Sequence, residues 1–509
     1  MCFDRSNGKL LWQSGVTYTD REPTQRDNPY CAATPVTDGE RVIASFGSAG
    51  LYCYDLEGKE IWHRDFGKMS HMFGNAASPM LAGDLCILNF GPDEKARLIA
   101  VSKHDGKTVW EVEPPKVDPG EQAPRGGFGG GGPGGPGGRG GFGPGMTLAP
   151  QMFSQADQNK DGKLTKAELT SLADVWFDKL DPDKAGKLSQ EQFAAKFYEA
   201  VPPSEPACDP GATPGGAAPG RRGPSRTTAP AVFTAADTDK DGSLTRAELS
   251  NTFAKWFDEW DSAKGGSLNE DKLRDGLNAA LPRPNFGGGQ GGPGGRGGGG
   301  GGSWSTPILI QAAGRDELIM NFPNRLAAYD PKTGRQLWLS KGLGGTIYTT
   351  PLWGEGALLA MNSGPGGGGA IALKPGSSGE VTESQRLWRL DRVKSGIGSG
   401  VIHEGHAYLI SQDGIAACLD LKDGKTVWEE RLKGPGSRNS SWSSMLLADG
   451  KIYVPNQSGD VFVLRAAPKF ELLATSSVNE PTNASLAPSD GELFLRTDRS
   501  LWCFANAKR

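Results

Sequence analysis

Two stretches of twelve residues, Asp157–Glu168 and Asp237–Glu248, carry oxygen-bearing side chains at the same spacing. In both, positions 1, 3 and 5 are Asp or Asn, position 6 is glycine and position 12 is glutamate. Oxygens so spaced, with the carbonyl of position 7, supply the roughly six to eight ligands that a calcium ion takes. The sequence therefore predicts two calcium-binding loops. Their ligands are Asp157, Asn159, Asp161, Lys163 (carbonyl), Thr165 and Glu168 in the first, and Asp237, Asp239, Asp241, Ser243 (carbonyl), Thr245 and Glu248 in the second.

Each predicted loop is followed by a related stretch that has lost carboxylates, Asp181–Gln192 after the first and Asp261–Lys272 after the second. Fewer carboxylates mean less charge to attract the ion, so we expect these stretches to be structural partners of the intact loop in the same repeat. Weak metal binding at Asp181 and Asp183 stays open. The replaced ligand positions are Ala185 and Gln192 in the first stretch and Ala263, Gly265 and Lys272 in the second.

Helices are expected on both sides of the intact loops, because apolar residues such as Leu169 and Trp176 follow at helical spacing. The two halves align at one constant offset, which places Trp176 on Trp256 and indicates an internal duplication. The helix–loop–helix pattern resembles the EF-hand proteins. We expect an all-α domain made of one EF-hand pair in residues 149–202 and a second in residues 231–282.

Segments rich in glycine and proline border these pairs. Such compositions bury too little apolar surface to order, so we expect flexible linkers at residues 113–148, 203–230 and 283–303. Arg-Gly-Gly triplets in two of them also occur in RNA-binding tails. The shortage of interleaved aromatic residues favours the linker interpretation.

Outside this insertion the chain repeats one phrase: an apolar strand, a turn with Asp and Gly, and a second apolar run that ends in tryptophan, as in Tyr52–Trp62 and Ala328–Trp338. A second phrase precedes it and begins with Ser or Thr, as at Thr34. Roughly seven such units of about 40–50 residues, each with four short strands, have the period and content of propeller blades. We assign a structural role to the repeated tryptophans, which are Trp12, Trp62, Trp110, Trp338, Trp388 and Trp428.

The phrase that ends at Trp338 is similar to the repeat of the PQQ-like (pyrroloquinoline-quinone-like) β-propeller family. The resemblance implies an all-β propeller of about seven to eight four-stranded blades, with the all-α EF-hand domain inserted into it. Residues 1–112 would form the N-terminal blades and residues 304–509 the C-terminal blades. In this family the tryptophans dock between neighbouring blades. The whole organisation resembles proteins of planctomycete-type bacteria.

The resemblance also raises the question of a quinone cofactor. Quinoprotein alcohol dehydrogenases that resemble this fold hold PQQ with an adjacent-cysteine disulfide, a calcium bound by Glu and Asn, and an Asp base. The sequence has no Cys-Cys pair, and we find no such ligand cluster in the repeats. We therefore expect Ca²⁺ as the cofactor, expect no PQQ, and assign no catalytic residue. A PQQ-dependent dehydrogenase that oxidises alcohols or sugars is the alternative.

Two histidines could also suggest a metal pair. His403 and His406 fall on the turn that Asp38 and Gly39 form in an earlier repeat. That position favours a solvated hairpin tip over a ligand set.

Composition excludes several classes of protein. A net charge of −4 over 509 residues gives no electrostatic case for nucleic acid, and no apolar run is long enough to span a membrane. Of seven cysteines, Cys2, Cys53, Cys418 and Cys503 fall near one repeat position. A recurring position indicates small packed residues rather than disulfides or a zinc site.

The chain begins inside a repeat, and two explanations are open. Cys2–Trp12 could supply outer strands that the last repeat lacks. Alternatively the sequence starts late, without a leader and part of a blade. The likeness of Trp502–Phe504 to Cys2–Phe3 favours the second explanation. No signal peptide is present in the given sequence.

Segments that lead into the innermost strands vary where the rest repeats. Loops at the mouth of a propeller channel commonly form pockets and partner surfaces, although ordinary loop polarity would explain the same residues. The candidates are Asn28, His71, Asn75, Trp304, Tyr348, Asn439, Trp442 and Asn483.

Together these features predict a calcium-binding scaffold or interaction protein rather than an enzyme. We expect a monomer with a protein or polysaccharide partner in the bacterial envelope. Because the family is typically exported, we expect a periplasmic or extracellular location. Calcium sites of the extracellular kind have dissociation constants on the order of 0.1–1 mM.

Overall fold

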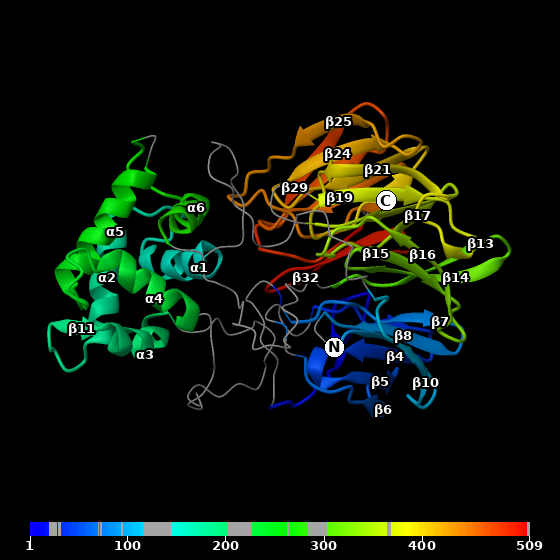
Figure 1. Cartoon of the computed structure of the whole chain (residues 1–509), viewed down its shortest axis with the longest axis horizontal. Coiled ribbons are helices and arrows are strands. Elements are labelled where there is room, and N and C mark those ends of the chain that lie inside the picture. Colours follow the sequence, from blue (N-terminus) through cyan, green and yellow to red (C-terminus); the bar gives the residue numbers. More distant parts are fainter. Residues whose placement is uncertain are drawn as a thin grey trace. The chain divides into compact units, whose positions relative to one another are not determined.

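The computed structural model describes residues 1–19, 28, 32–69, 71, 74–92, 95–116, 144–201, 225–261, 264–281, 303–363 and 368–505. They form two compact units, a β unit on both sides of the insertion and an α unit within it (Figure 1). Most of the three predicted linkers lies outside the described residues, as does Ala263. Helices begin at Pro144 and Ser225, within the ranges predicted as linkers.

The β unit is a propeller whose sheets follow one another along the chain as antiparallel meanders. Among the described residues six sheets have four meander strands, one has three and one has two. The strands are β1 (Cys2–Phe3) and β2 (Leu10–Trp12); β3 (Val36–Thr37), β4 (Arg41–Ser45), β5 (Leu51–Asp55) and β6 (Glu60–Arg64); β7 (Met80–Ala82), β8 (Leu85–Phe90), β9 (Arg97–Ser102) and β10 (Thr108–Val112); β13 (Ile308–Ala312), β14 (Arg315–Phe322), β15 (Arg325–Tyr329) and β16 (Gln336–Lys341); β17 (Leu352–Gly354), β18 (Ala357–Met361), β19 (Gly368–Leu373) and β21 (Arg386–Val393); β22 (Val401–His403), β23 (His406–Ile410), β24 (Ile415–Asp420) and β25 (Thr426–Arg431); β26 (Leu446–Ala448), β27 (Lys451–Pro455), β28 (Asp460–Arg465) and β29 (Leu472–Ser477); β30 (Ala487–Ser489), β31 (Glu492–Arg496) and β32 (Leu501–Phe504).

The repeated tryptophan lies opposite a small residue on the neighbouring strand. Cys53 is the cross-strand partner of Trp62, and Ala100 is the partner of Trp110. A small side chain leaves room for the indole ring, which explains why cysteine and alanine alternate at this position. Cys53 and Cys418 are buried free thiols, whereas Cys2 is half-buried and Cys503 is exposed.

Each of several tryptophans docks on the turn of the following sheet. The indole N–H of Trp62 donates to the carbonyl of Lys103 at 3.1 Å, and the ring lies against the α-carbon of Gly106. A Cβ on Gly106 would come within 2.7 Å of that ring, and this residue also has a positive φ of 70°. Glycine is therefore required at this turn for two reasons. The backbone has a positive φ angle, and the indole ring occupies the space that a Cβ would need. Equivalent indole–carbonyl hydrogen bonds join Trp12 to Leu56, Trp110 to Pro331, Trp388 to Leu421 and Trp428 to Ala467.

The sheet that contains Trp338 uses a different contact. The next sheet has a long connection between β19 and β21, and part of it, β20 (Gly379–Glu380), adds in parallel to the edge of β16. The Trp338 indole N–H instead donates to the buried carboxylate of Glu317 at 2.7 Å. Arg315 pairs with that carboxylate at 2.7 Å, so the buried charge is compensated.

The Ser or Thr that opens each repeat links neighbouring sheets. The main-chain N–H of Thr34 donates to the Ser78 hydroxyl at 2.9 Å, and the N–H of Ser78 donates to the Thr306 hydroxyl at 3.1 Å. A hydroxyl next to the first strand thus satisfies an amide of the preceding sheet. The same bond joins Thr350 to Ser399, Ser399 to Ser444 and Ser444 to Ser485.

The N-terminal hairpin stands between the last sheet and the β3–β6 sheet. Trp12 donates to the β3–β6 sheet through Leu56, while Arg5 pairs with Glu492 at 2.9 Å and with Asp490. Among the described strands, β1 and β2 pair with each other and not with β32. The contacts to the last sheet are therefore made by side chains rather than by a completed four-stranded sheet.

The described residues of the α unit form two short strands and six helices, and these helices enclose one core. Helix α1 packs against α6, α2 against α5, and α3 against α4. Leu169, Trp176 and Phe253 are fully buried at their centre. The elements are α1 (Pro144–Ala156), α2 (Lys166–Leu180), β11 (Lys187–Ser189), α3 (Gln190–Ala200), α4 (Ser225–Ala236), β12 (Ser243–Thr245), α5 (Arg246–Trp260) and α6 (Glu270–Ala280).

Candidate calcium-binding site

The first predicted loop joins α1 to α2. Its glutamate, Glu168, lies in the first turn of α2 and accepts from the main-chain N–H and the hydroxyl of Thr165, both at 2.8 Å. Thr165 in turn caps the helix by accepting from the N–H of Glu168. The carboxylate of Asp157 accepts from the N–H groups of Asp161 and Gly162 at 3.2 and 3.1 Å. These hydrogen bonds hold the turn of the loop.

The second predicted loop joins α4 to α5 and brings three carboxylates together. One oxygen from each of Asp237, Asp239 and Glu248 lies within 4.8 Å of the others. Asp237 Oδ1 is buried and has no hydrogen-bond partner. A buried, unpartnered carboxylate oxygen beside two further carboxylates is the arrangement that a hard cation would stabilise.

Hydrogen bonds lower the pKa of two carboxyl groups in this loop. Burial raises the pKa of Glu248, but donors that include the hydroxyl and N–H of Thr245 outweigh burial and hold the pKa below its ordinary value. The main-chain N–H of Ser243 lowers the pKa of Asp241, against a smaller effect of burial, and Lys187 lowers it further. Both groups are therefore ionised at neutral pH, as calcium ligands must be.

In each degraded loop, main-chain amides of the loop hydrogen-bond to the carboxylate at position 1. Asp181 is buried, and its two oxygens accept from the N–H groups of Ala185 and Gly186 at 2.8 and 2.7 Å. Asp261 does the same with Gly265 and Gly266 at 3.0 and 2.7 Å. Asp157 of the first intact loop makes the equivalent two bonds, so these amides hold the turn in intact and degraded loops alike.

The glutamine at position 12 of the first degraded loop keeps one of the two roles of glutamate. The side chain of Gln192 accepts from the N–H of Ser189 at 2.9 Å and completes the same capping box as Glu168. The residue thus still starts the helix but offers no carboxylate.

The two loops of one repeat do not pair with each other, contrary to the expectation from sequence. Strand β11 of the first degraded loop pairs with β12 of the second intact loop, with Leu188 opposite Leu244. The first intact loop pairs with the second degraded loop through Leu164 and Leu268, whose N–H and carbonyl groups bond reciprocally at 2.7 and 2.8 Å. Each intact loop therefore has a degraded partner, but from the other repeat.

The physical reason is that one helix serves two loops. Helix α2 leaves the first intact loop and enters the first degraded loop, and its 15 residues place their ends roughly 22 Å apart. Loops at opposite ends of a helix cannot bond. Helix α5 runs antiparallel to α2, as the ion pairs Lys166–Asp258 and Arg246–Asp178 show, and supplies a partner loop at each end.

Asp181 and Asp183, the possible weak metal site, have different surroundings in the structure. Asp181 faces the amides of its own loop, whereas the Asp183 carboxylate is 89% exposed and lies 3.9 Å from the Lys196 ammonium. Weak metal binding there stays a prediction.

The candidates at the channel mouth fall into smaller groups. The rings of His71, Trp304 and Tyr348 form one cluster, with centroids 4.9 and 5.2 Å apart, and burial raises the pKa of Tyr348 to about 12. The Trp304 indole N–H donates to the carbonyl of Gly74, next to Asn75. Asn483 accepts from Gln457, whose side-chain oxygen accepts from Ser440, the neighbour of Asn439. Asn28 and Trp442 are half-buried.

His403 and His406 lie on the turn between β22 and β23, directly opposite each other in register. The residues between them, Glu404 and Gly405, both have positive φ angles, as a tight hairpin requires. His406 Nδ1 bonds to the Glu404 carbonyl at 2.6 Å.

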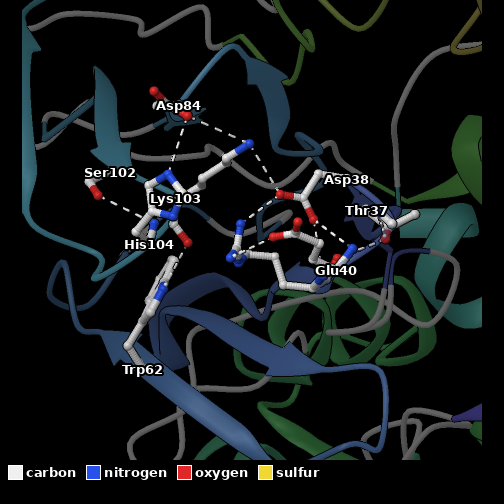
Figure 2. A network of polar contacts seen from close by, with 10 residues as sticks. Thr37, Asp38, Glu40, Trp62, Asp84, Ser102, Lys103 and His104 are labelled. Carbon is white, nitrogen blue, oxygen red and sulfur yellow. Dashed lines mark hydrogen bonds and ion pairs between the residues drawn. The ribbon is translucent and has the colours of Figure 1, made fainter.

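A polar network joins the β3–β6 and β7–β10 sheets and was not predicted (Figure 2). Asp38 pairs with Arg41 of its own hairpin at 2.7 Å and with Lys103 of the next sheet at 3.2 Å. Oδ1 of Asp84 lies 3.2 Å from Nε2 of His104. Burial alone would raise the pKa of Asp38, but the N–H groups of Glu40 and Arg41 and the ammonium of Lys103 hold it well below its usual range. This network clamps two blades together beside the Trp62 contact.

Comparisons with known proteins address the propeller first. The family model described as outer membrane protein assembly factor BamB matches residues 1–123 and 322–485, which is more than half of the chain. The chain belongs to this family. The EF-hand family model matches residues 150–173 and 231–254, which contain the two intact loops, so this BamB-like propeller of PQQ-like repeats carries an EF-hand insertion.

Individual relatives of this BamB-like chain are distant. The outer membrane protein assembly factor BamB of Marinobacter adhaerens is 25% identical over 164 residues, which are 32% of this chain and 37% of that protein. The chain thus spans little more than a third of the length of this curated relative. The crystal structure of BamB from Moraxella catarrhalis aligns with a TM-score of 0.46 at 10% identity over 97% of this chain and 88% of that one. The designed protein Ika8 aligns with a TM-score of 0.38 at 7% identity over 95% of this chain and 99% of that one.

None of the described helices has the length and hydrophobicity that crossing a membrane requires.

Proposed function

We propose that this BamB-like chain is a calcium-binding propeller scaffold of the bacterial envelope. The two intact EF-hand loops bind one Ca²⁺ each through the ligands predicted from sequence, and the propeller presents a surface to a protein partner. On this proposal the chain acts as a monomer outside the cytoplasm and catalyses no reaction.

The carboxylate group of the second intact loop carries the calcium proposal. Main-chain amides can occupy both oxygens of the first carboxylate of a loop, as they do at Asp181 and at Asp157. In the second intact loop Asp237 Oδ1 is buried without a partner and lies in a group with Asp239 and Glu248. The donor set is all oxygen, which suits a hard cation such as calcium.

The envelope role is supported by the family alone. The matching family model and the curated relative are both named outer membrane protein assembly factor BamB, and this name supports an envelope role with a protein partner. The ring cluster of His71, Trp304 and Tyr348 supports a partner surface at the start of the inner strands.

Calorimetric titration with CaCl₂ tests the calcium proposal. We expect the wild-type chain to bind about two ions, with dissociation constants on the order of 0.1–1 mM. Glu168→Gln and Glu248→Gln should each remove one site, and the double variant should bind none. These variants are conservative because Gln192 already completes a capping box at the same position of a neighbouring loop.

Asp183→Asn in a degraded loop is the matched control and should leave both sites unchanged. Unaltered calcium binding by the double variant would contradict the assignment of the ligands. The scaffold proposal also expects no uptake of PQQ and no dye-linked oxidation of alcohols after incubation with the quinone. Either activity would favour the dehydrogenase alternative.

A further inference from the structure

The exchange of loops between repeats places a lysine beside a predicted calcium ligand. Because β11 pairs with β12, Lys187 of the first degraded loop reaches Asp241 of the second intact loop. Its Nζ lies 3.3 Å from Asp241 Oδ2. The two side chains are 63% and 41% exposed, so the ion pair can open without disturbing the core.

We propose that Lys187 sets the calcium affinity of the second intact loop, a role that rests on the calcium binding proposed above. The ammonium group neutralises the ligand at position 5 in the absence of metal, and calcium must displace it. Part of the electrostatic gain on binding is therefore offset by the loss of the Lys187–Asp241 pair. The first degraded loop would thus adjust calcium binding by the second intact loop, although its own sequence lacks the calcium ligands.

The two intact loops differ in the number of carboxylates, and Lys187 acts on the loop that has more of them. The second loop has four carboxylates, Asp237, Asp239, Asp241 and Glu248, whereas Asn159 replaces one of them in the first loop. More carboxylates raise the attraction for calcium. Lys187 offsets one of the four ligand carboxylates of the second loop, which leaves the ligand set with the charge of the three carboxylates of the first loop.

The other loop pair has no equivalent cation. Leu268 pairs with Leu164 as Leu188 pairs with Leu244, so Ser267 stands where Lys187 stands. Serine carries no charge and cannot compete for Asp161. The device is thus specific to one site, and the chain itself offers the position for a reciprocal substitution.

The test uses the full chain with one site removed. In the Glu168→Gln background only the second loop binds, and CaCl₂ is titrated calorimetrically with and without Lys187→Met. We expect the dissociation constant to fall by about two- to fivefold, the range for an exposed ion pair. Lys255→Met removes a comparably exposed lysine from α5, outside all four loops, and is the matched control that should have no effect.

The reciprocal experiment uses the Glu248→Gln background, where only the first loop binds. Ser267→Lys should weaken that site by a similar factor. An unchanged or higher dissociation constant for Lys187→Met, or an equal gain for Lys255→Met, would overturn the role of Lys187 while leaving calcium binding intact. A complete absence of binding in the Glu168→Gln protein would instead overturn the proposed function of the second loop.

Discussion

The indole ring of Trp110 packs on the α-carbon of Gly334, and its N–H donates to the carbonyl of Pro331 at 2.9 Å. The insertion separates these residues in sequence. Even so, they make the same contact that Trp62 makes with Gly106 in consecutive repeats. The β7–β10 and β13–β16 sheets are therefore neighbours, and the EF-hand unit is inserted without interrupting the order of the blades.

Gly334→Ala should destabilise the propeller more than Gly314→Ala. The φ angles are 70° at Gly334 and 76° at Gly314, so alanine introduces similar backbone strain at both positions. Only at Gly334 would the new Cβ meet a side chain, Trp110 at 2.7 Å, whereas nothing lies within 4 Å at Gly314. We expect an additional cost of about 1–3 kcal/mol for Gly334→Ala, measured by urea unfolding followed by tryptophan fluorescence. Equal losses for the two variants would show that Trp110 can move aside.

Asp38→Asn should lower stability at pH 7 by about 1 kcal/mol, because it weakens the hydrogen-bonded ion pairs with Arg41 and Lys103. The folded-state pKa of Asp38 is depressed, so its stabilisation is present above the unfolded pKa of about 3.9 and is lost as the pH falls toward the folded value. The difference between wild type and variant should thus be constant from about pH 8 to 5 and shrink below about pH 4. Denaturant melts at pH 7, 5 and 3 measure it.

The control for this profile is Asp84→Asn, whose side chain is 81% exposed. Little loss of stability is expected at any pH, because exposed pairs contribute little. A gap for Asp38→Asn that persists unchanged at pH 3 would rule out the carboxylate as its source.

The two repeats of the EF-hand unit should fold only together. The ring of Trp176 on α2 lies 5.6 Å from that of Phe253 on α5, and both side chains are fully buried. A fragment of residues 144–201 would expose this face and lose the partner of Leu164, so we expect it to be unfolded or to dimerise. Circular dichroism and light scattering, compared with a fragment of residues 144–281, measure this. A folded monomeric half would contradict the shared core.

The two calcium ions should bind nearly independently. The intact loops lie toward opposite ends of α2, roughly 22 Å apart by the length of this helix. This distance exceeds the Debye length of about 8 Å at physiological salt, so repulsion between the ions is screened. Each dissociation constant of the wild type should agree within about twofold with that of the variant that keeps only that site. A larger change in either single-site variant would indicate coupling through α2.

Local patterns were sufficient wherever the chemistry is local. The ligand positions of each loop, the capping pair of Thr165 and Glu168, and the four-strand repeat ending in tryptophan depend on residues within one turn or one hairpin. For that reason the EF-hand insertion and the propeller could both be recognised before the structure was known. The degraded loops that begin at Asp181 and Asp261 were likewise recognised from carboxylates that are missing in the sequence.

The contacts between repeats could not be predicted, because they depend on which ends of elements meet in space. The length of α2 places its two loops out of reach of each other, and only the antiparallel packing of α5 decides that Leu188 meets Leu244. The same packing brings Lys187 to Asp241, two residues that no pattern connects. The sequence by itself therefore determined the two folds and the spacing of the predicted calcium ligands. Tertiary structure decided the partner of each loop and the charge beside it, since both arise from long-range packing of a duplicated core.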